Sequence, residues 1–110
     1  MVIDLNKQPV KTMVNFNGGK KELSAHMFVD EAGNKIFIGK LIPGASIGLH
    51  THETSCEVIY VLKGQGKVLY EDETLNVSAG LCHYCPKGKK HSLINDSEED
   101  LEFFAVVPLQ

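Results

Sequence analysis

The 110-residue sequence contains no arginine, and all eleven of its Lys and Arg positions are lysine. Arginine supplies the forked guanidinium on which most phosphate and base recognition relies. Its absence, together with a net charge of −3, argues against nucleic acid as a partner. Long apolar runs are absent as well, since none approaches the roughly 20 residues of a membrane-spanning helix. Residues 1–8 lack the basic and apolar pattern of a secretory signal, so we expect a cytoplasmic protein with no membrane partner.

Cysteine is scarce, with only Cys56, Cys82 and Cys85 in the chain. Three cysteines argue against the disulfide framework of a small secreted domain. Cys82 and Cys85 have the C-x-x-C spacing of redox motifs, but they fall in a segment that we expect to be a strand. Residues three apart on a strand face opposite sides of the sheet. We therefore interpret these two residues as core or interface cysteines.

The apolar segments are short and are separated by Gly, Pro, Asn and Asp at close intervals. No window keeps helical periodicity for more than about two turns, so the pattern predicts an all-β fold. At 110 residues the chain can bury one core, which makes 1–110 a single domain, an antiparallel sandwich or barrel. The expected strands are 24–29, 35–42, 45–51, 57–63, 66–71, 73–77, 81–86, 91–95 and 101–107.

Residues 1–19 are weakly patterned, and we expect them to be either a covering strand or a flexible arm. A strand at a sheet edge has unpaired N–H and C=O groups, which invite association with a second subunit. Phe103 and Phe104 are adjacent, so one should enter the core and the other should point outward, where it suits an interface. We therefore expect a homodimer.

The segment 44–64 contains three candidate metal ligands between two glycines, in the pattern G-x5-H-x-H-x4-E-x6-G. Side chains alternate across a strand, so His50 and His52 point to the same side of the sheet. The polar stretch 53–56 can turn the chain back, which would bring Glu57 beside the two histidines.

The segment 80–95 adds a fourth candidate in the pattern G-x5-P-x-G-x2-H-x3-N. Its tight turn at 86–90 delivers His91 at the start of the next expected strand. Three imidazoles and one carboxylate form a mixed nitrogen and oxygen ligand set that suits one divalent transition metal ion, such as Fe, Mn, Ni or Zn. An apolar interior would be a costly place to leave these groups unpaired.

Both segments match, position for position, the two motifs of the cupin superfamily, and the chain resembles a small single-domain bacterial cupin. The resemblance covers Gly44 to Asn95, about half of the chain. It implies a conical jelly-roll barrel, or double-stranded β-helix, that is frequently dimeric. It also implies that the metal is held by His50, His52, Glu57 and His91. Leu81 departs from the pattern, because many cupins have an acidic residue there, but that position is not a ligand.

A divalent ion with one carboxylate and three neutral imidazoles carries a formal charge of +1, which favours an anionic or oxygen-chelating ligand. An octahedral ion would keep two adjacent positions open, whereas tetrahedral zinc would be closed. The leading hypothesis is a cupin that acts on a small organic molecule, with the metal as Lewis acid and substrate template in dioxygenase, isomerase or lyase chemistry. The alternative is a cupin that only binds or senses such a molecule.

Other side chains are expected to surround the ligands. Ile59 and Val61 share the side of Glu57 and would form an apolar, substrate-binding wall. The sequence does not fix whether the side of the strand on which His83 lies is the interior. Candidate acids or bases beyond the ligands, none of them placed by a motif, are His26, Tyr60, His83 and Tyr84.

Overall fold

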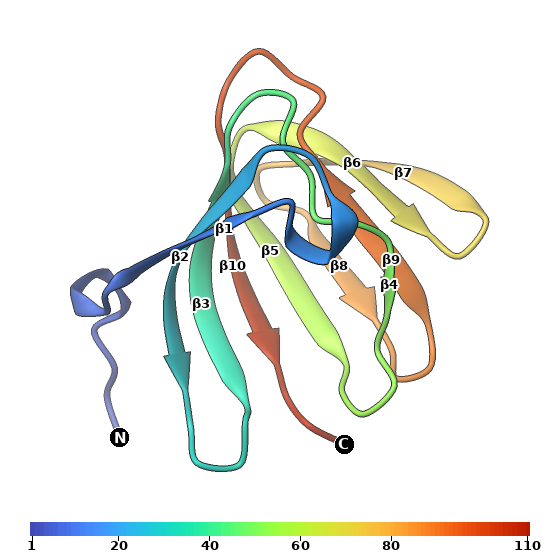
Figure 1. Cartoon of the computed structure of the whole chain (residues 1–110). Helices are drawn as coiled ribbons and strands as arrows, with labels where there is room; N and C mark the ends of the chain where they lie inside the picture. Colours follow the sequence, from blue (N-terminus) through green and yellow to red (C-terminus); the bar gives the residue numbers. More distant parts are fainter.

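The computed structural model describes all 110 residues and consists mainly of antiparallel strands (Figure 1). A six-stranded sheet has the order β1-β2-β3-β10-β5-β8, and a four-stranded sheet has the order β4-β9-β6-β7. No helix in the structure has the length and apolar character needed to cross a membrane. The strands are β1 (Val10–Val14), β2 (Glu22–Val29), β3 (Lys35–Leu41), β4 (His50–Thr51), β5 (Glu57–Lys63), β6 (Gln65–Tyr70), β7 (Glu73–Ser78), β8 (Cys82–Cys85), β9 (Lys90–Ile94) and β10 (Leu101–Val107).

The all-β prediction is confirmed, and the bounds of eight expected strands agree with the structure to within two residues. The N-terminal segment also contains a strand, because β1 pairs with β2 along its whole length. Two short 3-10 helices, η1 (Leu5–Lys7) and η2 (Phe16–Gly18), flank β1. Residues 10–14 therefore form an edge strand of the six-stranded sheet.

The expected strand 45–51 is wrong over most of its length, because only β4 is regular there. Before β4, this segment pairs with β9 only through separate contacts, such as that of the Ile47 N–H with the Leu93 carbonyl, and its other edge docks on residues 16–20. The Ser46 N–H donates to the Lys20 carbonyl, and the Gly48 N–H donates to the Phe16 carbonyl, each at 2.9 Å. A side chain at Gly48 would overlap the Asn17 carbonyl, so this close docking requires glycine.

The core lies between the two sheets and is filled by alternate residues of the strands. Phe103 is fully buried, and the edge of its ring contacts Phe37 with ring centroids 5.9 Å apart. Gly39 lies beneath the Phe103 ring, and a Cβ there would collide with it. Phe104 points outward and is half-buried, so the expected division between these two neighbouring rings is confirmed.

Asn95, the last residue of the second motif, is completely buried and holds together the connection that leads into β10. Its side-chain amide donates to the Leu41 carbonyl at 2.8 Å and to the Glu99 carbonyl at 2.7 Å. Its side-chain oxygen accepts from the Ser97 N–H and hydroxyl. Asn95 thus has a structural role and leaves the metal site to the other residues of the motif.

We expect Phe103→Ala to lower the free energy of unfolding by about 3–5 kcal/mol, because it empties the space between the sheets. Urea unfolding followed by circular dichroism measures this change. Thr74→Ala is the matched control, with an expected loss below about 1 kcal/mol, because Thr74 is exposed and lies on the face of β7 opposite to the buried Val77. Equal losses in the two variants would contradict the core described above.

Candidate metal centre

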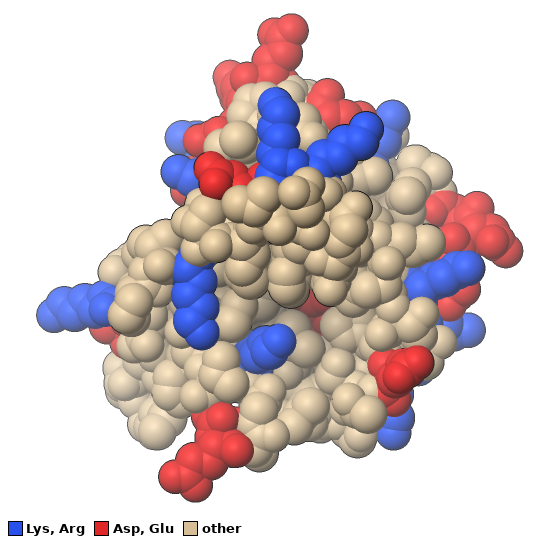
Figure 2. All heavy atoms as spheres, in the orientation of Figure 1, with Lys and Arg blue, Asp and Glu red and all other residues tan.

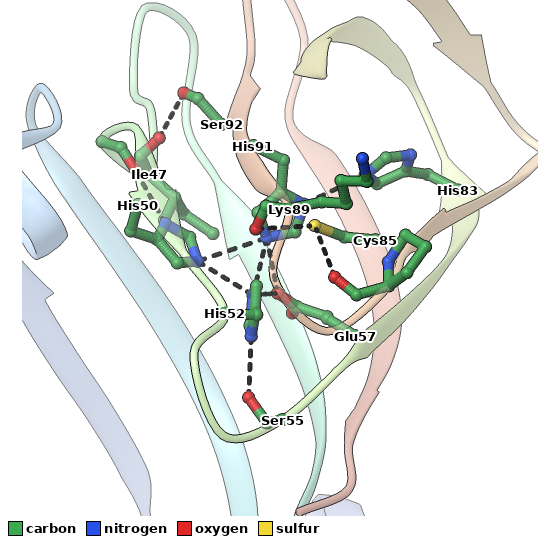
Figure 3. Close-up of polar contacts among 12 residues, drawn as sticks. Ile47, His50, His52, Ser55, Glu57, His83, Cys85, Lys89, His91 and Ser92 are labelled. Atoms are coloured by element: carbon green, nitrogen blue, oxygen red, sulfur yellow. Dashed lines mark hydrogen bonds and ion pairs between the residues drawn. The ribbon is translucent and has the colours of Figure 1, made fainter. Parts of the chain in front are cut away.

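Four candidate ligands from both motifs meet in the interior of the barrel (Figure 3). His50 and His91 are directly opposite each other in the pairing of β4 with β9, and Glu57 begins β5 of the other sheet. His52 follows β4 and is fixed by its backbone, since its N–H donates to Lys89 and its carbonyl accepts from Gly88. The cluster therefore joins the two sheets.

The ring nitrogens of the three histidines point toward one another. The Nε2 atom of His52 lies 2.9 Å from that of His91, and both lie 3.2 Å from that of His50. The Glu57 Oε1 atom lies 3.1 Å from His52 Nε2 and 3.0 Å from His91 Nε2. The separation between His50 and Glu57 is larger, more than 4.0 Å but within 4.8 Å.

These separations fit four ligands of one ion. Ligand atoms at right angles and about 2.1 Å from a shared ion are about 3.0 Å apart, and opposite ones are about 4.2 Å apart. Five separations between the four atoms match the first value, and the sixth, from His50 to Glu57, falls in the range of the second. The cluster can hold a metal ion, and its shape resembles four corners of an octahedron.

The other nitrogen of each imidazole has its own partner, which fixes the direction of the ring. His50 Nδ1 lies 2.8 Å from the Gly48 carbonyl oxygen, and His52 Nδ1 lies 2.8 Å from the Ser55 hydroxyl. His91 Nδ1 lies 3.0 Å from His83 Nε2. With the proton on Nδ1 in each ligand, all three Nε2 lone pairs are directed at the centre of the cluster.

The charge states of the cluster suit a cation. Burial alone would raise the pKa of Glu57, but hydrogen bonds from His52 and His91 outweigh that effect and lower the pKa to about 2. Burial also lowers the pKa of His50, which favours its neutral form. An ionised carboxylate and a neutral imidazole are the forms in which these groups bind metals.

Ile59 and Val61 lie on the same interior face as Glu57, as the alternation of side chains predicts, but each is only 1% exposed. Both belong to the closed hydrophobic core. Their side chains pack in the core beneath the strand that begins with Glu57, and neither is exposed to a cavity or to solvent. Their expected contact with a substrate stays a prediction.

The structure brings one of the four candidate acids or bases to the cluster. His83 is buried beside His91. Tyr60 and Tyr84 are about half exposed, at 42% and 54%, and lie on the outer face of the six-stranded sheet, away from the cluster. The His26 ring contacts the Gln8 carbonyl near the N-terminus at 2.7 Å.

Cys82 is exposed and Cys85 is buried, which confirms that the two thiols face opposite sides of β8. Cys85 lies near His83 and His91, with the three potential ligand atoms within 4.8 Å of one another. Its thiol is directed at the Lys89 and Pro86 carbonyls, at 3.6 and 3.9 Å. Burial raises the pKa of Cys85 to about 11, so the thiol is neutral at pH 7.

Two residues beside the site were not expected from the sequence, Ser55 and Tyr70. Ser55 lies in the turn before β5, and its hydroxyl orients His52. The ring of Tyr70 lies edge-on to His83, with centroids 5.6 Å apart. Ser55 occupies a variable position of the first motif, and its contact is local, but the motif does not single it out. Tyr70 lies outside both motifs, and its contact depends on how β6 and β8, which belong to different sheets, are placed.

Access to the cluster is narrow. His50 is half-buried, whereas His52, Glu57 and His91 are at most 7% exposed. None of the surface cavities is lined by any of these four residues. Figure 2 shows a small hollow with an acidic side chain at its bottom and lysine beside it, while most other charges are peripheral. Three of the four candidate ligands are therefore shielded from solvent.

Two antiparallel sheets around a buried cluster of three histidines and a glutamate define a small β-barrel protein with a candidate metal site in its interior. The family model of the cupin domain matches residues 37–107, well over half of the chain. The chain therefore belongs to the cupin family. This result confirms the resemblance inferred from the motifs, and the double-stranded β-helix fold with it.

Relatives of known description have similar sequences and folds. An oxalate-binding protein from Thermotoga maritima is 35% identical over 99% of this chain and 94% of its own length. The crystal structure of a predicted oxalate decarboxylase from Thermotoga maritima has a TM-score of 0.88, with 30% identity and full coverage of both chains. The polyketide cyclase RemF from Streptomyces resistomycificus shares the fold, with a TM-score of 0.78 and 21% identity over 100% of this chain and 83% of that one.

We expect His52→Ala to abolish tight metal binding, because His52 is close to all three other members of the cluster. Elemental analysis after loading and dialysis should give about one divalent ion per wild-type chain and close to none in the variant. His26→Ala is the matched control, since His26 lies away from the cluster and should retain full metal content. Unchanged metal content in His52→Ala would contradict the assignment of this ligand.

Proposed function

We propose that this protein binds one six-coordinate divalent metal ion and, through that ion, a small dicarboxylate or related oxygen chelator such as oxalate. The observation that carries the proposal is the unequal set of separations in the cluster. Four corners of a tetrahedron are all equally far apart, whereas the separation from His50 to Glu57 clearly exceeds the other five. Six-coordinate Mn(II), Fe(II), Co(II) or Ni(II) suits this arrangement better than tetrahedral Zn(II).

The same arrangement supports binding of a chelating ligand. With His50 and Glu57 as opposite ligands and His52 and His91 at right angles to both, the two remaining positions of an octahedron are adjacent. A bound ion supplies Lewis acidity there, together with a formal charge of +1 for the cluster. A small dicarboxylate can bind the ion through two oxygens, one from each carboxylate. Such an anion matches the positive charge of the cluster, the two adjacent open positions and the narrow access. The oxalate-binding protein at 35% identity makes oxalate the first ligand to test.

We expect oxalate to bind the Mn(II)-loaded protein with a stoichiometry near one and to show no binding to the metal-free protein. Isothermal titration calorimetry measures both. Formate and acetate, which have a single carboxylate, are the matched ligands and should bind at least tenfold more weakly. Equal binding of oxalate with and without metal would contradict the proposal, as would equal affinity for formate.

Catalysis is the second candidate, and it is favoured by the similarity to the predicted oxalate decarboxylase, at 30% identity over the full length of both chains. Decarboxylation would consume one proton and release carbon dioxide and formate from each oxalate. Two measurements distinguish a decarboxylase from a binding protein. The Mn(II)-loaded protein is incubated with oxalate, and formate production and oxygen uptake are then measured. Formate at a stoichiometry above one per chain would establish a decarboxylase, whereas intact oxalate would establish a binding protein.

The homodimer is also a proposal, and it is supported by the outer face of the six-stranded sheet. Two rows of side chains without Asp, Glu or Lys cross five strands of this face. The rows are His26, Ile38, Phe104, Tyr60 and Cys82, and Phe28, Ile36, Val106, Val58 and Tyr84. An uncharged band of this kind, which ends at Lys40 and Glu102 in the next row, is compatible with itself, so a second copy related by a two-fold axis can cover it.

We expect Tyr60→Lys to convert a dimer into a monomer, because the two-fold axis would bring like charges into the apolar interface. Light scattering coupled to size-exclusion chromatography should show a mass near twice 12.1 kDa for the wild type and near 12.1 kDa for the variant. Thr74→Lys, on the outer face of β7, is the matched control and should leave the dimer intact. A wild-type mass of one chain would contradict this proposal.

A further inference from the structure

His83 lies behind His91, on the side of that imidazole that faces away from the ligand cluster (Figure 3). Its Nε2 atom is 3.0 Å from His91 Nδ1, and the contact is buried. The two rings are tilted by 33° with centroids 5.2 Å apart, so the approach is through the ring edges that carry these nitrogens. The contact is a hydrogen bond between imidazoles, one of which must donate and the other accept.

Which ring donates decides whether His91 can serve as a ligand. A neutral imidazole has one N–H and one lone pair. If His91 carries its proton on Nδ1, it donates to His83 Nε2 and directs the lone pair of its own Nε2 at the metal. If His83 donated instead, the His91 proton would lie on Nε2 and would point at His50, His52 and Glu57, where it would block the metal.

We propose that His83 is a positioning residue of the metal centre, which accepts the Nδ1 proton of His91 and thereby keeps the Nε2 lone pair of His91 available to the metal. The inference rests on the proposed metal binding, because it assigns a role at the same site. The partner in this contact is an imidazole, which is less common than a carboxylate or a carbonyl behind a metal-bound histidine.

The location of His83 distinguishes it from the partners of the other two ligand histidines. Gly48 and Ser55 are two and three residues from the histidines that they contact, within the same short segment. His83 lies on β8 of the six-stranded sheet, whereas His91 lies on β9 of the four-stranded sheet. Of the three Nδ1 contacts, this is the one that fixes a ligand to the opposite sheet.

The surroundings hold His83 in place. It is 7% exposed, stands opposite Ile59 in the pairing of β5 with β8, and has the Tyr70 ring against it. Cys85 is the other side chain of β8 near His91, but its thiol is directed at two backbone carbonyls. His83 is therefore the side chain that occupies the position next to His91 Nδ1.

Two substitutions separate the hydrogen-bond acceptor from the bulk of the ring. His83→Gln places an amide oxygen near the position of Nε2, whereas His83→Leu fills similar space without an acceptor. We expect His83→Leu to bind Co(II) about 10–100-fold more weakly than the wild type in a chelator competition, and His83→Gln to recover most of this loss. The visible spectrum of bound Co(II) should change in the Leu variant and return toward the wild type in the Gln variant.

The outcomes identify which inference fails. Equal Co(II) affinity in the wild type, His83→Leu and His83→Gln would overturn the role of His83. Equal losses of Co(II) affinity in the two variants, with urea unfolding unchanged, would overturn it as well. A wild-type protein that binds no Co(II) would overturn the metal site itself and this role with it.

Should His83→Leu not fold, long-range 1H–15N NMR of the wild-type protein loaded with Zn(II) provides the same test. The expected spectrum shows His91 protonated on Nδ1 and His83 unprotonated on Nε2. A proton on His83 Nε2 in the metal-loaded protein would overturn the proposal.

Discussion

The structure depends on the convergence of four electron-pair donors in a buried space. Three imidazole nitrogens and a carboxylate oxygen lie 2.9–3.2 Å apart in five of their six pairs. Lone pairs at this separation repel one another unless a proton or a cation lies between them, and burial removes the water that would otherwise screen them. A divalent ion would satisfy all four donors together.

The barrel is the scaffold that holds these donors against their mutual repulsion. The candidate ligands come from β4 and the residue that follows it, from β5 and from β9, so the pairing within both sheets contributes to one site. The N-terminal segment contributes indirectly, because η2 docks on Gly48, whose carbonyl in turn lies 2.8 Å from His50 Nδ1. Gly48 itself cannot be replaced without overlap with Asn17. Residues of η2, which lie outside the cluster, therefore help to set the direction of the His50 ring.

Local alternation accounts for what could be predicted from the sequence. Side chains alternate along a strand, and this rule predicted three features. They are the common side of His50 and His52, the opposite directions of Phe103 and Phe104, and the separation of Cys82 from Cys85. The motif resemblance added the family and the fold. The contact between His83 and His91 could not be predicted, because it depends on the placement of β8 relative to a strand in the other sheet. The irregular segment 45–51 escaped prediction for a similar reason, since one of its edges docks on residues 16–20, which are distant in the sequence.

The central claim is that the cluster provides four ligands of a six-coordinate ion and keeps two adjacent positions for a small chelating anion. X-ray absorption spectroscopy of the Co(II)-loaded protein, with and without oxalate, tests this claim most directly. The account predicts six nitrogen and oxygen neighbours at about 2.1 Å in both samples, and an added carbon shell from the chelate when oxalate is present. Four neighbours at about 2.0 Å, unchanged by oxalate, would indicate a closed tetrahedral site and would contradict the account.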